Sequence, residues 1–317
     1  MSASADLSSP LPQRLKAWID ERFPLANAPA FFLFYLTAAF VAAHDRGGAV
    51  QFSFTDLVSC LAVWSMFLLL RVFDEHKDYA EDVIYHSDRV LQRGLITLGH
   101  LKIVGAVCFA FTLLWSLARG GGFGAPAIAW IIMTGWACLM AVEFFCSVWL
   151  KERLTIYALS HMAIMPLVAW WCVTLKSPTA AFTSNVALLA LLFFLTGLAF
   201  ELGRKTRGPE EERDGVDSYS KIFGTRESAV LVLIVTIAIV ALIEVLVAQM
   251  QAPPHAVWLF APAIVGGLPP VAAILMFLRT PSASGRKKTE ASLGLLALFG
   301  YGAIITAVIV SNGFVWT

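Results

Sequence analysis

Long apolar stretches alternate with short polar ones along almost the whole chain. The apolar stretches cover residues 25–43, 54–73, 103–118, 126–149, 154–175, 185–200, 228–247, 257–277 and 291–310. Their lengths approach or exceed the roughly 20 residues with which an α-helix crosses a bilayer. The pattern therefore predicts an all-α, polytopic membrane protein, in which residues 25–317 form a bundle of nine transmembrane helices.

The first 24 residues follow a different pattern. Apolar side chains recur at helical spacing opposite charged ones, at Leu11, Leu15, Trp18, Ile19 and Phe23. This spacing is typical of an amphipathic helix lying in the headgroup region, and no continuous apolar core marks a signal peptide. We expect residues 1–24 to be a cytoplasmic segment with an interfacial helix, although a disordered tail is an equal alternative for residues 1–10.

Composition supports the membrane assignment and excludes several other classes. Hydrophobic residues make up 58% of the chain and charged residues 14%. The five cysteines all fall in predicted spans without paired spacing, so neither a disulfide framework nor a zinc site is indicated. No basic patch interleaved with aromatic residues is present, and nucleic acid is therefore not an expected partner.

The positive charges predict the orientation of the bundle. Of the 23 Lys and Arg residues, all except Arg46, Arg119 and Lys176 fall in the N-terminal segment or in loops on one side of the predicted bundle. Short loops rich in Lys and Arg face the cytoplasm. We therefore expect the N-terminus inside, the C-terminus on the opposite side, and residence in the inner or plasma membrane if the source is bacterial. Asp56, near the opposite edge, is expected to reach headgroups or water.

Two charged segments interrupt the apolar pattern on the predicted cytoplasmic side. The first cassette, residues 74–82, places Asp74, Asp78 and Asp82 four residues apart. On one helix this spacing forms a stripe of carboxylates that repel each other. A divalent cation such as Mg²⁺, which prefers oxygen ligands, would relieve the repulsion. A solvated helix face neutralised by nearby basic residues is the alternative, and for this cassette alone the two stand about even.

The second cassette, residues 201–214, mixes acidic and basic side chains on the same side of the membrane. Inside the predicted spans, Glu143 and His161 lie about two helical turns from the cytoplasmic edge. Polar groups at that depth usually face the interior of the bundle. Two interpretations stand for this pair: groups that bind substrate or handle protons in a cavity, or hydrogen-bonding partners between neighbouring helices.

These features together resemble the UbiA superfamily of intramembrane prenyltransferases. Asp74, Asp78 and Asp82 fit the first aspartate-rich motif of that family, and a segment from Arg89 to Gly94 resembles its Arg-Pro-Leu-x-x-Gly element without the Pro. Leu150 to Arg153 is similar to a Leu-Lys-Arg element, and Gly215 to Gly224 resembles the stretch after the second motif. The resemblance runs over nearly the whole chain. It implies nine helices around a central cavity that opens near the cytoplasmic side.

The second motif departs from the family pattern. Counted back from Gly215, the positions of the family's aspartates hold Arg204, Arg207 and Glu211. Guanidinium and ammonium groups bind a diphosphate directly, so this segment is expected to hold the anion while using fewer metal ions. Glu201, Glu210, Glu211 and Asp214 are candidates for a further metal ligand. Anchoring of the helix end to anionic headgroups is the alternative for the basic residues.

The resemblance implies a membrane-embedded, Mg²⁺-dependent prenyltransferase that moves an isoprenyl group from a prenyl diphosphate to an acceptor that the sequence does not identify. It assigns Asp74, Asp78 and Asp82 to catalysis and to Mg²⁺, with Glu211 as a second metal ligand. The residues expected to bind the diphosphate are Arg204, Lys205 and Arg207, and more weakly Arg89 and Lys151. Two alternatives stay open: a terpene cyclase of the same fold, and a non-catalytic relative that binds or transports a lipid.

Overall fold

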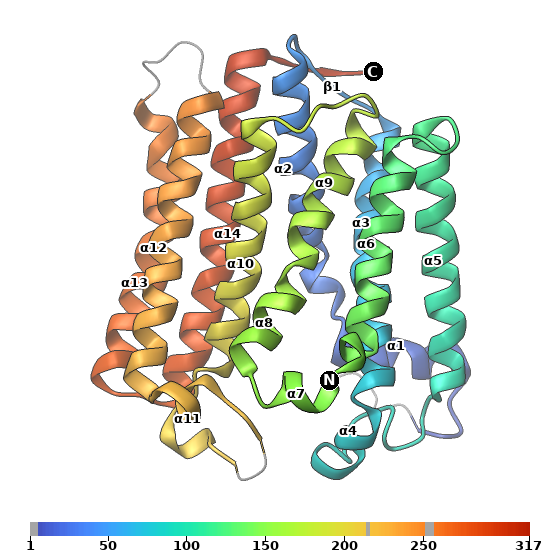
Figure 1. The fold of residues 1–317 in the computed structure, drawn as a ribbon, viewed down its shortest axis with the longest axis vertical. Helices are drawn as coiled ribbons and strands as arrows, with labels where there is room; N and C mark the ends of the chain where they lie inside the picture. The colour runs from blue at the N-terminus through green and yellow to red at the C-terminus, as the bar shows by residue number, and fades with distance from the viewer. Residues whose placement is uncertain (1–5, 214–215, 251–256) are drawn as a thin grey trace.

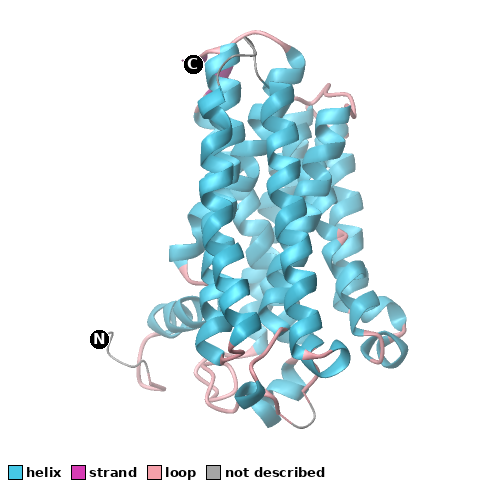
Figure 2. Ribbon diagram, turned by 90° about the vertical axis from the view of Figure 1, so that its left-hand side faces the viewer, coloured by secondary structure: helices cyan, strands magenta, loops and turns pink. Residues whose placement is uncertain are grey.

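The computed structural model describes residues 6–213, 216–250 and 257–317, and these residues form a bundle of long helices (Figures 1 and 2). The elements are α1 (Leu11–Arg22), η1 (Leu25–Asn27), α2 (Ala28–Arg46), β1 (Val50–Phe52), α3 (Phe54–Lys77), α4 (Tyr79–Tyr85), α5 (Leu98–Gly120), α6 (Ala125–Ala141), η2 (Glu143–Phe145), α7 (Ser147–Lys151), α8 (Leu154–Met162), α9 (Ile164–Lys176), α10 (Ser184–Lys205), η3 (Pro209–Glu211), α11 (Tyr219–Phe223), α12 (Thr225–Met250), η4 (Val257–Phe260), α13 (Ala261–Arg279), α14 (Ala283–Asn312) and β2 (Phe314–Trp316).

The transmembrane helices match the predicted apolar stretches. Within the described residues, eight helical segments are long and apolar enough to cross a membrane, and α6 is a shorter apolar helix in the remaining predicted place. All-α architecture and a polytopic membrane protein are thereby confirmed. The count of nine holds when the short α6 is included. Both cassettes lie at one end of the bundle, which we call the cassette end, and the C-terminal strand lies at the other (Figure 1).

The fourth predicted span, residues 126–149, is wrong as a continuous helix. Helix α6 ends at Ala141, and Glu143, Phe144 and Phe145 then have φ values of 47°, 53° and 58°. Left-handed backbone brings the Cβ atom too close to the following carbonyl oxygen, so no α-helix of L-residues continues through three such positions. The chain turns there and enters the short helix α7 at the cassette end.

The fifth span is one membrane crossing built from two helices. Helix α8 ends at Met162 and α9 begins at Ile164, with Pro166 in the first turn of α9. Proline has no backbone N–H and clashes with the carbonyl four residues earlier, which disfavours a straight helix through this point. The break lies directly beside His161, in the last turn of α8.

The N-terminal helix packs against the bundle. Helix α1 lies across the cassette end instead of along the bundle axis (Figures 1 and 2). Its Trp18 is fully buried, and Arg22 Nε donates to Glu75 Oε1 at 2.6 Å. Arg14 Nη1 donates to the carbonyl oxygen of Leu95 at 3.0 Å. These contacts make α1 a fixed part of the cassette end, and its place at a membrane interface stays a prediction.

A buried ion pair ties helices together at the opposite end. Lys176 Nζ lies 2.8 Å from Asp56 Oδ1, and the Tyr35 hydroxyl donates to the same oxygen at 2.6 Å. Asp56 is therefore inside the protein, and the expectation that it reaches headgroups or water is wrong. Nearby, β1 and β2 pair in parallel and hold the C-terminal segment against the loop after α2.

Candidate functional site

The first cassette is divided at Asp78. Helix α3 ends at Lys77, and Asp78 has φ −90° and ψ 0° before α4 begins. The stripe of carboxylates expected on one helix is therefore interrupted at Asp78. The Asp78 N–H nevertheless donates to the Asp74 carbonyl oxygen at 2.8 Å, and the Asp82 N–H donates to the Asp78 carbonyl oxygen at 2.9 Å. The three aspartates thus remain one helical turn apart along the chain.

Asp74 and Asp78 are both partly accessible at the cassette end. Their side chains keep 47% and 42% of their surface accessible although protein surrounds them on most sides. Lys77 Nζ lies 3.8 Å from Asp74 Oδ1 and 3.7 Å from Asp78 Oδ1. Burial raises the pKa of the Asp78 carboxyl to about 6 against the opposing charge of Lys77, and the nearby Asp74 adds to the rise. This pair of carboxylates therefore favours a cation between them.

Asp82, the third aspartate, is engaged in a different contact. It is buried, and Arg89 Nη1 donates to its Oδ2 at 2.5 Å. Arg22 Nη2 lies 3.9 Å from the same oxygen. Asp82 and Arg89, which the resemblance placed on Mg²⁺ and diphosphate respectively, neutralise each other here. The contact joins α4 to the loop that follows it.

The second cassette presents cations at the same end of the bundle. Arg204 Nη2 lies 2.6 Å and Lys205 Nζ 2.8 Å from the two carboxylate oxygens of Glu201. Glu201 is largely buried, while the Arg204 side chain keeps 60% of its surface accessible. Arg204 and Asp74 are near enough to interact electrostatically. Helices α3 and α10 therefore bring the first cassette's carboxylates and the second cassette's guanidinium to one site.

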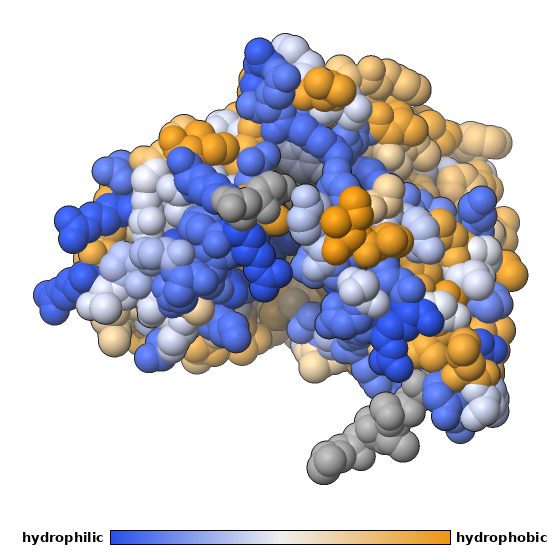
Figure 3. Space-filling view, turned by 90° about the horizontal axis from the view of Figure 1, so that it is seen from below, coloured by the Kyte–Doolittle hydropathy of each residue, from blue (hydrophilic) through white to orange (hydrophobic). Residues whose placement is uncertain are grey.

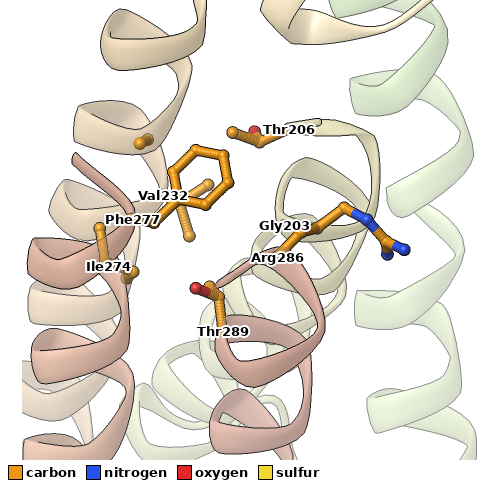
Figure 4. A pocket seen from close by; sticks show the side chains of 8 residues that line it. Gly203, Thr206, Val232, Ile274, Phe277, Arg286 and Thr289 are labelled. Atoms are coloured by element: carbon orange, nitrogen blue, oxygen red, sulfur yellow. The ribbon is translucent and has the colours of Figure 1, made fainter. Parts of the chain in front are cut away.

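The remaining acids of the second cassette hold the loop in place. Glu211 Oε1 lies 3.0 Å from Arg286 Nη2, and Glu211 also accepts the N–H of Gly208 at 3.3 Å. In Figure 4 the Arg286 guanidinium points away from the apolar lining of a small cavity between α10, α12, α13 and α14. These hydrogen bonds lower the pKa of Glu211 although burial opposes them. Glu211, predicted as a metal ligand, is thus in an ion pair.

The neighbouring residues Glu210 and Glu212 also hold the loop in place through hydrogen bonds. Glu210 accepts the backbone N–H of Ala283 at 2.6 Å, and Glu212 accepts hydrogen bonds from Ser218 and Ser220 at 2.8 and 2.6 Å. The Ser220 hydroxyl also accepts the backbone N–H of Arg207 at 2.8 Å. Asp214 and Gly215, which entered the alignment of this cassette with the family, lie outside the described residues.

Tyr157 on α8 connects the two cassettes, and nothing in the sequence beyond its position in an apolar span marks it as a site residue. Its hydroxyl accepts a hydrogen bond from Lys77 at 2.7 Å. The ammonium of Lys205 lies 5.4 Å from the centre of its ring, within range of a cation–π contact. Lys77, one of the basic residues beside the first cassette, and Lys205 thus meet on one aromatic ring.

Lys151, a further candidate for the diphosphate, lies at the edge of this site. Its Nζ is 2.5 Å from Glu81 Oε1 and 3.8 Å from Glu143 Oε1. The hydrogen bond to Glu81 raises the pKa of Lys151. This contact links α7 to α4 across the cassette end. Figure 3 views that end and shows a surface hollowed near its centre, with hydrophilic residues gathered around the opening.

The accessible carboxylates suit a Mg²⁺ ion that is coordinated partly by the protein and partly by a substrate. No cluster of three or more His, Cys, Asp or Glu side chains within residues 6–213, 216–250 and 257–317 is arranged to enclose a metal ion. Mg²⁺ is usually held by one or two carboxylates together with water and substrate phosphates, without a cage made wholly of protein. Asp74 and Asp78, both accessible and both already facing the Lys77 ammonium, match that requirement.

One family model matches most of this chain. A family model described as the UbiA prenyltransferase family matches residues 31–302. A search of curated proteins finds no significant match. A solved structure described as "Structural and mechanistic insights into the biosynthesis of Digeranylgeranylglyceryl phosphate synthase in membranes" aligns with a TM-score of 0.63 and 16% identity, over 94% of this chain and 99% of that chain. An apo structure of a UbiA homologue from Aeropyrum pernix K1 aligns with a TM-score of 0.60 and 16% identity, over 88% and 96% of the two chains. Both structures share the fold of this chain.

Proposed function

The chain belongs to the UbiA prenyltransferase family, and from this premise we propose that it is a Mg²⁺-dependent enzyme that transfers an isoprenyl group from a prenyl diphosphate to a small or lipid acceptor. The observation that carries the proposal is that Asp74 on α3 and Arg204 on α10 lie within electrostatic range of each other at the hollowed end of the bundle. Acidic side chains from one part of the chain can bind a metal ion, and basic side chains from a distant part can bind an anion beside it. We place this hollow on the cytoplasmic side of the membrane.

The basic residues would bind the diphosphate. Arg204 and Lys205 share the carboxylate of Glu201, which fixes both cations on the same side of α10. A guanidinium binds phosphate oxygens with paired hydrogen bonds, whereas an ammonium acts as a compact point charge. Because negative charge accumulates on the diphosphate as its bond to the prenyl carbon breaks, these groups stabilise the transition state more than the ground state.

The acidic residues would bind the metal ion. Asp74 and Asp78 supply hard oxygen ligands, and Asp74 lies within electrostatic range of Arg204. When bound there, Mg²⁺ would neutralise charge on the phosphate oxygens. Lys77, held by Tyr157, maintains a positive charge between the two carboxylates and limits their repulsion in the free enzyme. The protein groups thereby prepare the site before either ligand arrives.

An aromatic cluster lies deeper in the bundle, directly inward of the charged residues. Phe67 lies seven residues before Asp74, on the same face of α3 and about 10 Å further into the membrane. Its ring is 4.5 Å from Phe31 and 5.6 Å from Phe34, and Phe34 is 4.7 Å from Phe193 of α10. Such rings suit an isoprenoid tail, and their electron-rich faces stabilise an allylic cation that water would otherwise capture.

A direct test uses the purified protein in lipid nanodiscs with geranyl, farnesyl and geranylgeranyl diphosphate. Mg²⁺ is supplied or chelated, and cell extract serves as the source of acceptors. We expect diphosphate release and a prenylated product by mass spectrometry, both dependent on the cation and on the extract. Release without extract, with a hydrocarbon or terpenol as product, would support the cyclase alternative. No release with any substrate would exclude catalysis of prenyl transfer and favour a non-catalytic relative.

A further inference from the structure

A cavity of about 380 Å³ lies between α3 and α5, and we call it the α3–α5 groove. Its floor includes Leu69 and Val72 of α3, which are buried, and its rim includes Lys102, Ala106 and Phe109 of α5, which are exposed. The groove therefore opens on the outer surface of the bundle, where α5 lies at the edge (Figure 1). Its complete lining is Leu69, Val72, Phe73, His76, Lys102, Gly105, Ala106 and Phe109.

The groove and the charged site lie on different sides of α3. His76 follows Asp74 by two residues, which corresponds to a rotation of about 200° around the helix. Asp74 is the residue of α3 that lies within electrostatic range of Arg204, and no residue of the second cassette lines the groove within the described part of the chain. The groove is therefore separate from the site that we propose for the prenyl diphosphate.

The spacing of small and large side chains forms the groove. Its four residues on α3 and its four on α5 both recur after three, one and three positions, which places each set on one face of its helix. In the middle of the α5 set, Gly105 lies so close to α3 that a Cβ atom would be 3.1 Å from Cγ1 of Val72, and Ala106 adds only a methyl group. Because each set spans seven residues, the groove runs about 10 Å along the helices. Its interior is thus long, narrow and almost wholly apolar.

A single cation stands at the cassette end of the groove. Lys102 lies in the second turn of α5 and has neither a hydrogen bond nor an ion pair with any residue that the structure describes. Among the described residues the lining includes no acidic side chain, and its other ionisable group is His76, whose Nδ1 lies 2.8 Å from the carbonyl oxygen of Val72. The ammonium group of Lys102 is therefore free to bind an anion from outside the protein.

We propose that the α3–α5 groove binds an anionic glycerophospholipid of the surrounding leaflet, with one acyl chain between the two helices and the phosphate on Lys102. Both helices are long and apolar enough to cross the membrane, so the open side of the groove faces lipid. The phosphodiester carries a single negative charge, which one ammonium group balances, and basic residues at this level attract anionic lipids. A choline headgroup would bring a second cation close to Lys102 and is disfavoured. This inference goes beyond the proposed function and does not depend on it.

The test uses the purified protein in phosphatidylcholine nanodiscs that contain a trace of one photoactivatable lipid. The two probes are phosphatidylglycerol and phosphatidylcholine with the same diazirine-bearing acyl chain, so that they differ in the headgroup alone. After illumination, peptide mass spectrometry measures the labelling of residues 69–76 and 102–109. We expect phosphatidylglycerol to label both segments about fivefold more strongly, which is the effect of one lysine on an anionic headgroup.

Two pairs of variants locate the binding site. Lys102→Ala should bring the ratio of labelling to about one, whereas Lys288→Ala, which changes an exposed lysine of α14, should leave it at about fivefold. Ala106→Phe fills the groove from its exposed rim and should lower the labelling of both segments by both lipids. Val107→Phe is the matched control, because Val107 is 64% exposed on the same helix but does not line the groove.

Three results would overturn the inference. They are equal labelling of the wild type by the two lipids, a preference for phosphatidylglycerol that survives Lys102→Ala, and labelling that Ala106→Phe leaves unchanged. Excess geranylgeranyl diphosphate should not displace the phosphatidylglycerol label, and displacement would assign the groove to a prenyl diphosphate instead. Thermal melting of each variant in the same nanodiscs establishes that it is folded, since all four substitutions are at exposed positions.

Discussion

At the hollowed cassette end of the bundle, the first cassette exposes carboxylates, whereas the second exposes a cation. Asp74 and Asp78 are accessible there, and their nearest cation, Lys77, belongs to the same helix end. In the second cassette Arg204 is the accessible group and Glu201 lies behind it. The comparison teaches that the acidic content of a segment does not identify a metal site. What matters is which side chains remain free of partners from the rest of the chain.

The largest effect should come from removing a carboxylate of the first cassette. Asp78→Ala should lower the rate of Mg²⁺-dependent diphosphate release by about 100- to 1,000-fold, because a group that stabilises charge in the transition state is lost. Glu81→Ala, an exposed acid of the same cassette whose partner is Lys151, serves as the matched control and should change the rate by less than about threefold. Equal effects of the two variants would contradict the proposal that Asp78 binds the metal ion and Glu81 does not.

A smaller effect is expected from the cation of the second cassette. Arg204→Ala should weaken prenyl diphosphate binding by about 10- to 100-fold, since it removes charge-assisted hydrogen bonds worth about 1.5–3 kcal/mol. Titration of geranyl S-thiolodiphosphate, an analogue whose cleavage is slow, into nanodiscs measures this directly. Arg204→Lys should recover part of the affinity, and Arg279→Ala, which changes an exposed arginine at the same end of the bundle, should have no effect. Unchanged affinity in Arg204→Ala would exclude a direct contact with the anion.

Substitution of Glu211, the partner of Arg286, tests whether this acid of the second cassette stabilises the fold instead of binding a metal ion. Glu211→Gln should lower stability by about 1–3 kcal/mol while leaving diphosphate affinity unchanged. Because the pKa of Glu211 is below its ordinary value, its stabilisation is present above about pH 4.3 and is lost as the pH falls further. Thermal melting of the wild type and the variant at pH 7 and pH 4 measures the loss of stability and its dependence on pH. A variant that loses Mg²⁺ dependence at unchanged stability would restore Glu211 as a metal ligand.

Patterns local to the sequence predicted most of the fold. Apolar runs gave the positions of the membrane helices, and the two cassettes were expected at one end, where the structure has them. The break after α6 was missed because Glu143, Phe144 and Phe145 contain no glycine or proline to mark a turn. Left-handed backbone at ordinary residues depends on tertiary contacts, which periodicity does not report.

The composition of the site was predicted less fully than its location. Asp82 and Glu211 carry the right chemistry for a metal, but Asp82 is paired with Arg89 and lies near Arg22 of α1, and Glu211 is paired with Arg286 of α14. Such distant pairings are invisible in a single sequence. Tyr157 was missed for the converse reason, because a tyrosine in an apolar span usually serves packing. The cations it meets, Lys77 and Lys205, come from two other helices.

The smallest effect should distinguish two lysines at the cassette end, Lys151 and Lys205. Lys151 and Glu81 form an exposed pair, 47% and 59% accessible, and such pairs contribute at most about 1 kcal/mol. Lys151→Ala should therefore change thiolodiphosphate affinity by less than about twofold. Lys205 is held between Glu201 and the ring of Tyr157, so Lys205→Ala should weaken binding by about 5- to 10-fold. If both variants weaken binding equally, Lys151 also binds the diphosphate, and anion binding is not confined to the second cassette.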